Sequence, residues 1–187
     1  VDGDWSNNFR LEHDCTSQPY CTARIFRRGD VDLDYETLSS SKRVSFTVRV
    51  EDNGPGTKFN LCAVDIVVVN FNEVPLLIED KGVLSIDENS LPGSMVQGGP
   101  ITASDVDDNS LTFIIVGGSG ANSFYFANSY TYKGQAGYFT TDVLLKPGVE
   151  LNFESNAAAL TLDIFCKDEE GLVSATKTYP NLLGSIN

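Results

Sequence analysis

The chain has 187 residues, 41% of them hydrophobic, and its 26 acidic residues against 13 basic ones give a formal net charge of -13. That hydrophobic content is too high for a disordered acidic tail. The negative balance excludes a nucleic-acid binder that tracks phosphates, and it makes an anionic membrane surface an unfavourable partner. No apolar run approaches the roughly 18–20 residues of a membrane-spanning helix, so we expect no membrane insertion by this segment.

The composition offers little for catalysis. His13 is the one histidine, which leaves His-based relays and His-rich zinc sites without the side chains that they need. The sequence contains no Gly-Lys-Ser/Thr phosphate loop and no Gly-x-Gly-x-x-Gly after a strand-like run. We therefore expect that the chain is not an enzyme.

Short runs with period-two alternation, broken by Gly, Asn, Asp and Pro, are the main local signal, and they predict β-strands. The clearest is Arg43 to Val50, which places Val44, Phe46, Val48 and Val50 on one face. In chain order, strands are expected over 43–50, 63–69, 84–89, 111–116 and 160–165. No window of a dozen residues holds a helical period. The predicted class is all-β, with a β-sandwich architecture.

The four cysteines lie outside any C-x-x-C spacing. Cys15 and Cys21 flank the turn-like segment Thr-Ser-Gln-Pro-Tyr, and we expect them to close a short hairpin disulfide in an oxidising compartment. Cys62 and Cys166 lie far apart in the sequence, and their pattern leaves a disulfide bridge and two buried free thiols equally open.

Comparison of the chain with itself indicates two tandem repeats of roughly 100–115 residues. Leu33-Asp34-Tyr35-Glu36 is echoed by Leu151-Asn152-Phe153-Glu154, and Val1-Asp2-Gly3-Asp4 is similar to Val106-Asp107-Asp108-Asn109. We therefore predict repeat 1 over 1–74, partial and without its first strand, and repeat 2 over 75–187. The chain is expected to be a slice of a longer array.

Acidic side chains recur at matching places in the two repeats. Asp34 and Glu36 are two residues apart, as are Asp105 and Asp107, and this spacing predicts that each pair points from one face of an extended segment. Asp52 and Asp168 each follow a strand and precede a Gly-containing turn, while Asn70, Asn72 and Glu73 precede Pro75. Carboxylate and amide oxygens in this pattern suit a hard cation, and calcium tolerates irregular geometry better than magnesium does.

Taken together, these motifs resemble cadherin repeats, in the divergent form common outside the vertebrate adhesion molecules. Ile86-Asp87-Glu88-Asn89-Ser90 resembles the opening strand of that family, and Ser104-Asp105-Val106-Asp107 resembles its Asp-x-Asp motif. The two Leu-Asp/Asn-x-Glu segments are similar to its Leu-Asp-x-Glu motif, and Asn70-Phe71-Asn72-Glu73-Val74-Pro75 is similar to its linker. The resemblance implies tandem Greek-key β-sandwiches of the cadherin/Ig-like type.

The resemblance also implies Ca²⁺ between successive repeats. The ligands that it implies for the main junction are Asp34, Glu36, Asn70, Asn72, Glu73, Asp105, Asp107 and Asp168. Glu88, Asn152 and Glu154 would serve the next junction, and Asp2 and Asp52 the previous one, both incomplete. Asn70 and Asn152 stand where the family usually has Asp, so each keeps an oxygen but loses a charge, which weakens the site.

The function expected from these features is a calcium-binding extracellular structural or adhesion module, whose partners are the neighbouring repeats and proteins bound homophilically, heterophilically or in a filament. The alternative is a carbohydrate-binding or accessory domain of a secreted enzyme, with structural Ca²⁺. An aromatic-rich segment from Phe124 to Phe139 would supply the stacking platform for sugar rings in that alternative. Packed strands are the competing explanation for the same segment.

Overall fold

The computed structural model describes residues 5–16, 21–78, 83–128, 130–132, 137–154, 160–180 and 182–184. The chain forms two compact units, Val1–Phe71 (unit 1) and Asn72–Asn187 (unit 2); the sequence placed the repeat boundary between Val74 and Pro75. The described residues contain one 3-10 turn, η1 (Ser6–Asn8), and all their other secondary-structure elements are β-strands. The all-β prediction is confirmed.

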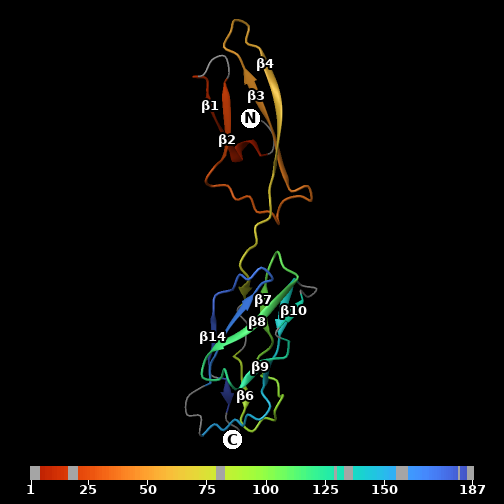
Figure 1. Cartoon of the computed structure of the whole chain (residues 1–187), viewed down its shortest axis with the longest axis vertical. Helices are drawn as coiled ribbons and strands as arrows, with labels where there is room; N and C mark the ends of the chain where they lie inside the picture. The colour runs from red at the N-terminus through yellow and green to blue at the C-terminus, as the bar shows by residue number, and fades with distance from the viewer. Residues whose placement is uncertain are drawn as a thin grey trace. The chain divides into compact units, whose positions relative to one another are not determined.

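Unit 2 holds the larger set of strands (Figure 1). They are β5 (Leu76–Leu77), β6 (Ile86–Asp87), β7 (Ile101–Ser104), β8 (Ser110–Gly117), β9 (Phe124–Phe126), β10 (Tyr130–Tyr132), β11 (Tyr138–Thr141), β12 (Val143–Leu145), β13 (Leu162–Lys167), β14 (Lys177–Tyr179) and β15 (Leu183–Gly184). Hydrogen bonding gives one sheet in the order β10-β8-β13-β14 and another in the order β11-β7-β5, with the pairs β12-β9 and β15-β6.

The core of unit 2 lies between these sheets, because alternate residues of each strand point inward. Ile101 on β7, Leu111 on β8 and Ile164 on β13 are each 0% exposed. Phe113 meets Phe126 edge to face, with ring centroids 5.9 Å apart. Phe124 and Phe139 also belong to this core, whereas Tyr138 of the same aromatic segment is 46% exposed.

Unit 1 contains β1 (Phe9–Asp14), β2 (Thr22–Arg27), β3 (Arg43–Glu51) and β4 (Phe59–Val67), paired as β1-β2 and β3-β4. Its smaller core is built around Phe9, which stacks on Phe46 with ring centroids 5.0 Å apart. Cys15 and Cys21, at the ends of the loop between β1 and β2, form the predicted disulfide. Cys62 and Cys166 are free thiols.

Strand registers show which parts of the two units correspond. Phe9 pairs with Arg27 across β1 and β2, as Phe124 pairs with Leu145 across β9 and β12. The β3-β4 pair corresponds in the same way to β13-β14. The described residues of unit 1 therefore include no counterparts of β5 to β8.

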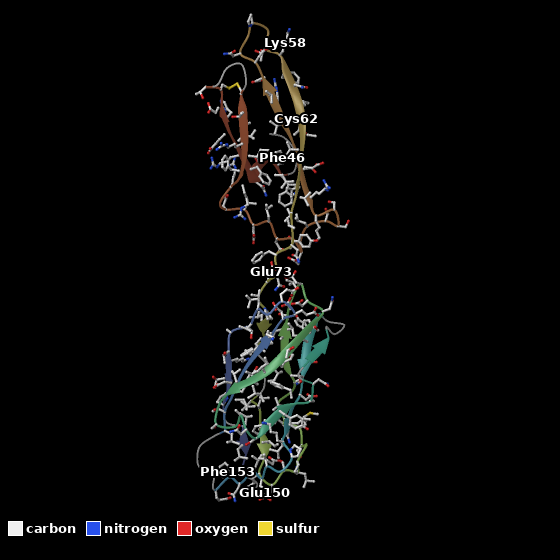
Figure 2. All side chains as sticks on the ribbon, in the orientation of Figure 1. Phe46, Lys58, Cys62, Glu73, Glu150 and Phe153 are labelled. Carbon is white, nitrogen blue, oxygen red and sulfur yellow. A yellow bond between two sulfur atoms is a disulfide. The ribbon has the colours of Figure 1, made fainter. Side chains whose placement is uncertain are left out.

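Among the described residues, β3 and β13 differ in how they are covered. In unit 2, Cys166 on β13 lies opposite Phe113 of β8 and is 0% exposed. Val50 has the corresponding place on β3 but is 61% exposed, because no strand equivalent to β8 covers it among the described residues. Cys62 on β4 is also exposed (Figure 2).

We predict that the two free thiols differ sharply in reactivity. Burial raises the pKa of the Cys166 thiol, which lowers the fraction of reactive thiolate, and the side chain is also inaccessible. In native protein, iodoacetamide should alkylate Cys62 and leave Cys166 intact until denaturant is added, as measured by peptide mass spectrometry. The Cys62→Ser variant is the control and should take up no label when native. Equal labelling of both thiols in the native protein would contradict the packing of unit 2.

Candidate metal centre

The predicted acidic ligands lie in turns, where one carboxylate oxygen accepts backbone hydrogen bonds. Asp34 Oδ1 accepts from the backbone N–H of Glu36 at 2.9 Å and of Thr37 at 3.1 Å. The prediction that Asp34 and Glu36 point from one strand face is therefore wrong, because this local hydrogen bonding folds the segment into a turn. In the same way Asp52 Oδ1 accepts from Gly54 at 3.2 Å and from Lys58 at 3.0 Å.

Asp105 repeats this turn at the end of β7. Its Oδ1 accepts from the backbone N–H groups of Asp107 and Asp108, both at 3.0 Å. The turn changes the direction of the chain between β7 and β8, so Asp107 is partly exposed while Asp108 points inward and is 6% exposed. Asp105 and Asp107 therefore both lie in the loop between β7 and β8, and not on a common face of a strand.

Asp168 lies on the loop between β13 and β14, next to this turn. Its Oδ1 accepts from the backbone N–H of Gly171 and of Leu172. Gly171 has a φ of +102°, a conformation that side chains disfavour, so glycine is suited to this tight loop. Asp168 Oδ2 accepts a 2.8 Å hydrogen bond from the side-chain amide of Asn72.

The first residues of unit 2 lie at the same end of the unit as Asp105 and Asp168. Asn72 bonds to Asp168, and the backbone N–H of Glu73 donates to Asp107 Oδ2 at 2.9 Å. Five residues predicted as ligands thus lie together within unit 2: Asn72, Glu73, Asp105, Asp107 and Asp168. The remaining three, Asp34, Glu36 and Asn70, belong to unit 1, where all are exposed or partly exposed.

A second predicted group lies at the other end of unit 2, as Figure 2 shows from the positions of Glu73 and Phe153. Glu88 follows β6, is 7% exposed, and accepts a 3.1 Å hydrogen bond from the backbone N–H of Phe153. This contact joins Glu88 to the turn that carries Asn152 and Glu154, both exposed. Asp2 lies outside the described residues.

A buried triad of carboxylates lies at the Glu73 end of unit 2. Asp105, Asp108 and Asp168 are each 4–6% exposed, and one oxygen from each lies within 4.8 Å of the other two. Asp105 Oδ2 and Asp108 Oδ2 are buried without a hydrogen-bond partner. Burial, followed by the neighbouring charges of Asp105 and Glu170, raises the pKa of Asp108 to about 6. Unpaired carboxylate oxygens of this kind are compatible with Ca²⁺.

Asp108 is the member of the triad that the sequence reasoning missed. Its position directly after Asp107 predicts an outward side chain if the segment is extended. The sequence does contain a signal for this position, the run Asp-Val-Asp-Asp after a strand. An aspartate at the start of a turn bonds to the backbone that follows it, and the turn changes the directions in which the next side chains point. The triad therefore contains two predicted ligands and one unpredicted carboxylate.

We expect the Asp108→Asn variant to gain stability with rising pH relative to the wild type, when both are kept in chelator. The folded-state pKa of about 6 lies above the ordinary value of 3.8, so the folded state holds the proton more tightly. Ionisation of Asp108 therefore costs stability as the pH rises from about 4 to about 6, and the variant avoids that cost.

Urea denaturation across this pH range measures the difference in free energy of unfolding between variant and wild type. The difference should grow up to a pH of about 6 and then level off. Asp142→Asn serves as the control because Asp142 is acidic, partly exposed and outside the triad. A difference that does not change with pH would contradict the buried environment of Asp108.

No known family model matches the sequence, and neither does any curated protein. No helix among the described residues is long and apolar enough to cross a membrane. Solved structures do match. Protocadherin gammaB7 EC3-6, solved as a cis-dimer, matches 95% of this chain at 15% identity with a TM-score of 0.55.

Two further structures match at lower TM-scores. Drosophila N-cadherin EC1-3 covers 81% of the chain at 18% identity and a TM-score of 0.47, and human desmocollin-1 covers 82% at 15% and 0.48. The chain spans 42%, 46% and 29% of the three matched chains, less than half of each. At these identities the protocadherin match shows the fold alone, and that fold is one of cadherin-like tandem β-sandwich repeats.

Proposed function

We propose that this chain is a calcium-binding segment of a longer extracellular protein, a structural or adhesion module whose junction between repeats is made rigid by Ca²⁺. The observation that carries the proposal is the gathering of Asn72, Glu73, Asp105, Asp107 and Asp168 at one end of unit 2, beside buried carboxylate oxygens without partners. Asp34, Glu36 and Asn70 would complete the ligand set from repeat 1.

The charge balance supports Ca²⁺ as the ion. The proposed junction has six carboxylates, and about two or three Ca²⁺ would bring their summed charge close to neutral. Ca²⁺ takes six to eight oxygen ligands and accepts irregular geometry, which suits side chains that come from separate turns. The neutral Asn70 makes this junction a weaker site than an all-aspartate version, so we propose an affinity of order 10⁻⁴–10⁻³ M.

Rigidity follows from the same charges. Without a cation, the carboxylates of repeat 1 and repeat 2 repel one another, and the linker between the repeats bends freely. A shared ion converts that repulsion into attraction and removes conformational freedom from the linker.

The remaining parts of the proposal concern context. The Cys15–Cys21 disulfide supports an oxidising extracellular setting. The partners proposed are neighbouring repeats and other proteins, and no catalytic role is proposed. Phe124, Phe126 and Phe139 are buried in the core of unit 2 and cannot stack on sugar rings, which leaves the carbohydrate-binding alternative to Tyr138, which is 46% exposed.

Glu36→Gln tests the junction, because it removes a charged ligand of repeat 1 without altering unit 2. In wild-type protein, Ca²⁺ should make the two units tumble together, and their rotational correlation times from ¹⁵N relaxation should converge on one longer value. In Glu36→Gln the two units should keep separate, shorter values in Ca²⁺.

The matched control is Glu12→Gln, which removes an exposed glutamate of unit 1 whose ion pair among the described residues is with the exposed Arg10. This variant should respond to Ca²⁺ as the wild type does. Correlation times of the wild type that do not change between chelator and millimolar Ca²⁺ would refute the rigid junction.

A further inference from the structure

We infer that the turn over residues 28–31 of unit 1 is a docking site for a receptor that carries a bound divalent cation, with Arg28, Gly29 and Asp30 making the contact. A metal ion on the receptor would bind the aspartate carboxylate, and an acidic pocket would bind the guanidinium. Integrins are receptors of this chemistry and bind the tripeptide Arg-Gly-Asp. The inference rests on the proposed function only for the extracellular setting, and it uses none of the proposed calcium ligands.

The turn follows directly on β2 and lies at the surface. The backbone N–H of Val31 donates to the carbonyl oxygen of Arg28 at 3.2 Å, which closes a β-turn with Gly29 and Asp30 at its two central positions. Arg28, Gly29 and Asp30 are all exposed. Because the hydrogen-bonded turn already fixes the backbone, a receptor that binds these residues does not have to order a loop.

Unit 2 contains the corresponding turn, and there the central residues have a structural reason. The turn over residues 146–149 follows β12 as the turn over 28–31 follows β2, and the N–H of Val149 donates to the carbonyl oxygen of Lys146 at 3.4 Å. Its central residues are Pro147 and Gly148, and Gly148 has a φ of +77°. A type II turn selects this pair, because proline presets the first central φ and glycine permits a positive second one.

The fold of unit 1 does not require glycine at position 29. The φ of Gly29 lies outside the left-handed region, and a Cβ added there meets nothing within 4 Å. The matching position in unit 2 holds Pro147, whose side chain is larger. Glycine is also the residue that lets a ligand approach the backbone closely. A contact with a molecule outside the chain therefore explains Gly29, since the turn itself does not.

The two charged side chains of the turn are available to such a receptor. Asp34 and Asp52 each use one oxygen to accept backbone N–H groups, whereas no hydrogen bond or ion pair among the described residues uses the Asp30 carboxylate. Nε of Arg28 donates to the carbonyl oxygen of Phe9 at 3.3 Å. This bond orients the guanidinium and leaves its two terminal NH₂ groups for a carboxylate of the receptor.

The test measures binding of the full chain to a panel of soluble integrin ectodomains, each chosen for its affinity for a cyclic Arg-Gly-Asp peptide, by surface plasmon resonance in Mn²⁺. The wild type should bind, and the free cyclic peptide should compete. Asp30→Glu keeps the charge but moves the carboxylate by one methylene, so it should weaken binding by about tenfold or more. Asp32→Glu changes another exposed acid two residues away and should bind as the wild type does.

Gly29→Ala tests the close approach separately from the charges. It should weaken integrin binding by about tenfold or more, while the melting temperature stays that of the wild type, because the added methyl group meets no atom of the chain. A variant that binds integrin as the wild type does would contradict the proposed contact at Gly29. Circular dichroism checks that each variant is folded.

The outcomes separate this inference from the rigid junction. If the wild type binds no member of the panel, or if Asp30→Glu and Asp32→Glu bind alike, the docking site is overturned. Glu36→Gln should bind integrin as the wild type does, even though it lacks a charged ligand of the junction. Binding that survives in this variant supports the docking site whether or not Ca²⁺ makes the junction rigid, and loss of binding overturns a site formed by the turn alone.

Discussion

The hydrogen bond from a backbone N–H to an aspartate oxygen is the interaction on which the proposed site depends. It recurs at Asp34, Asp52, Asp105 and Asp168, each at the start of a turn. One oxygen of each carboxylate fixes the turn, so the direction of the other oxygen is set by the backbone and not by a free rotamer. A ligand held in this way loses little conformational entropy when an ion binds.

At the Glu73 end, unit 2 buries both apolar side chains, which stabilise the fold, and acidic side chains, which destabilise it. The sandwich gains stability by burying Leu111, Phe113 and their neighbours, yet the loops that join its strands also bury Asp105, Asp108 and Asp168. A fold that carries acids against its own core gives up stability in chelator, and the proposed Ca²⁺ would restore it. If the proposed Ca²⁺ binds there, the stability of unit 2 depends on the concentration of the ion.

The sequence predicted what depends on local pattern. Alternation over Arg43 to Val50 located β3, and the spacing of Cys15 and Cys21 gave the disulfide. It failed where side chains bond back to their own backbone, since Asp34 turns a segment that looks extended and Asp105 directs Asp108 inward.

The open side of β3 has a consequence for the behaviour of the chain in solution. In unit 2, β13 is paired on both edges, by β8 and by β14, whereas β3 pairs only with β4 among the described residues. The second edge of β3 therefore presents backbone donors and acceptors beside Val50, which is 61% exposed. Unpaired strand edges of this kind are where sheets from other molecules can add a strand.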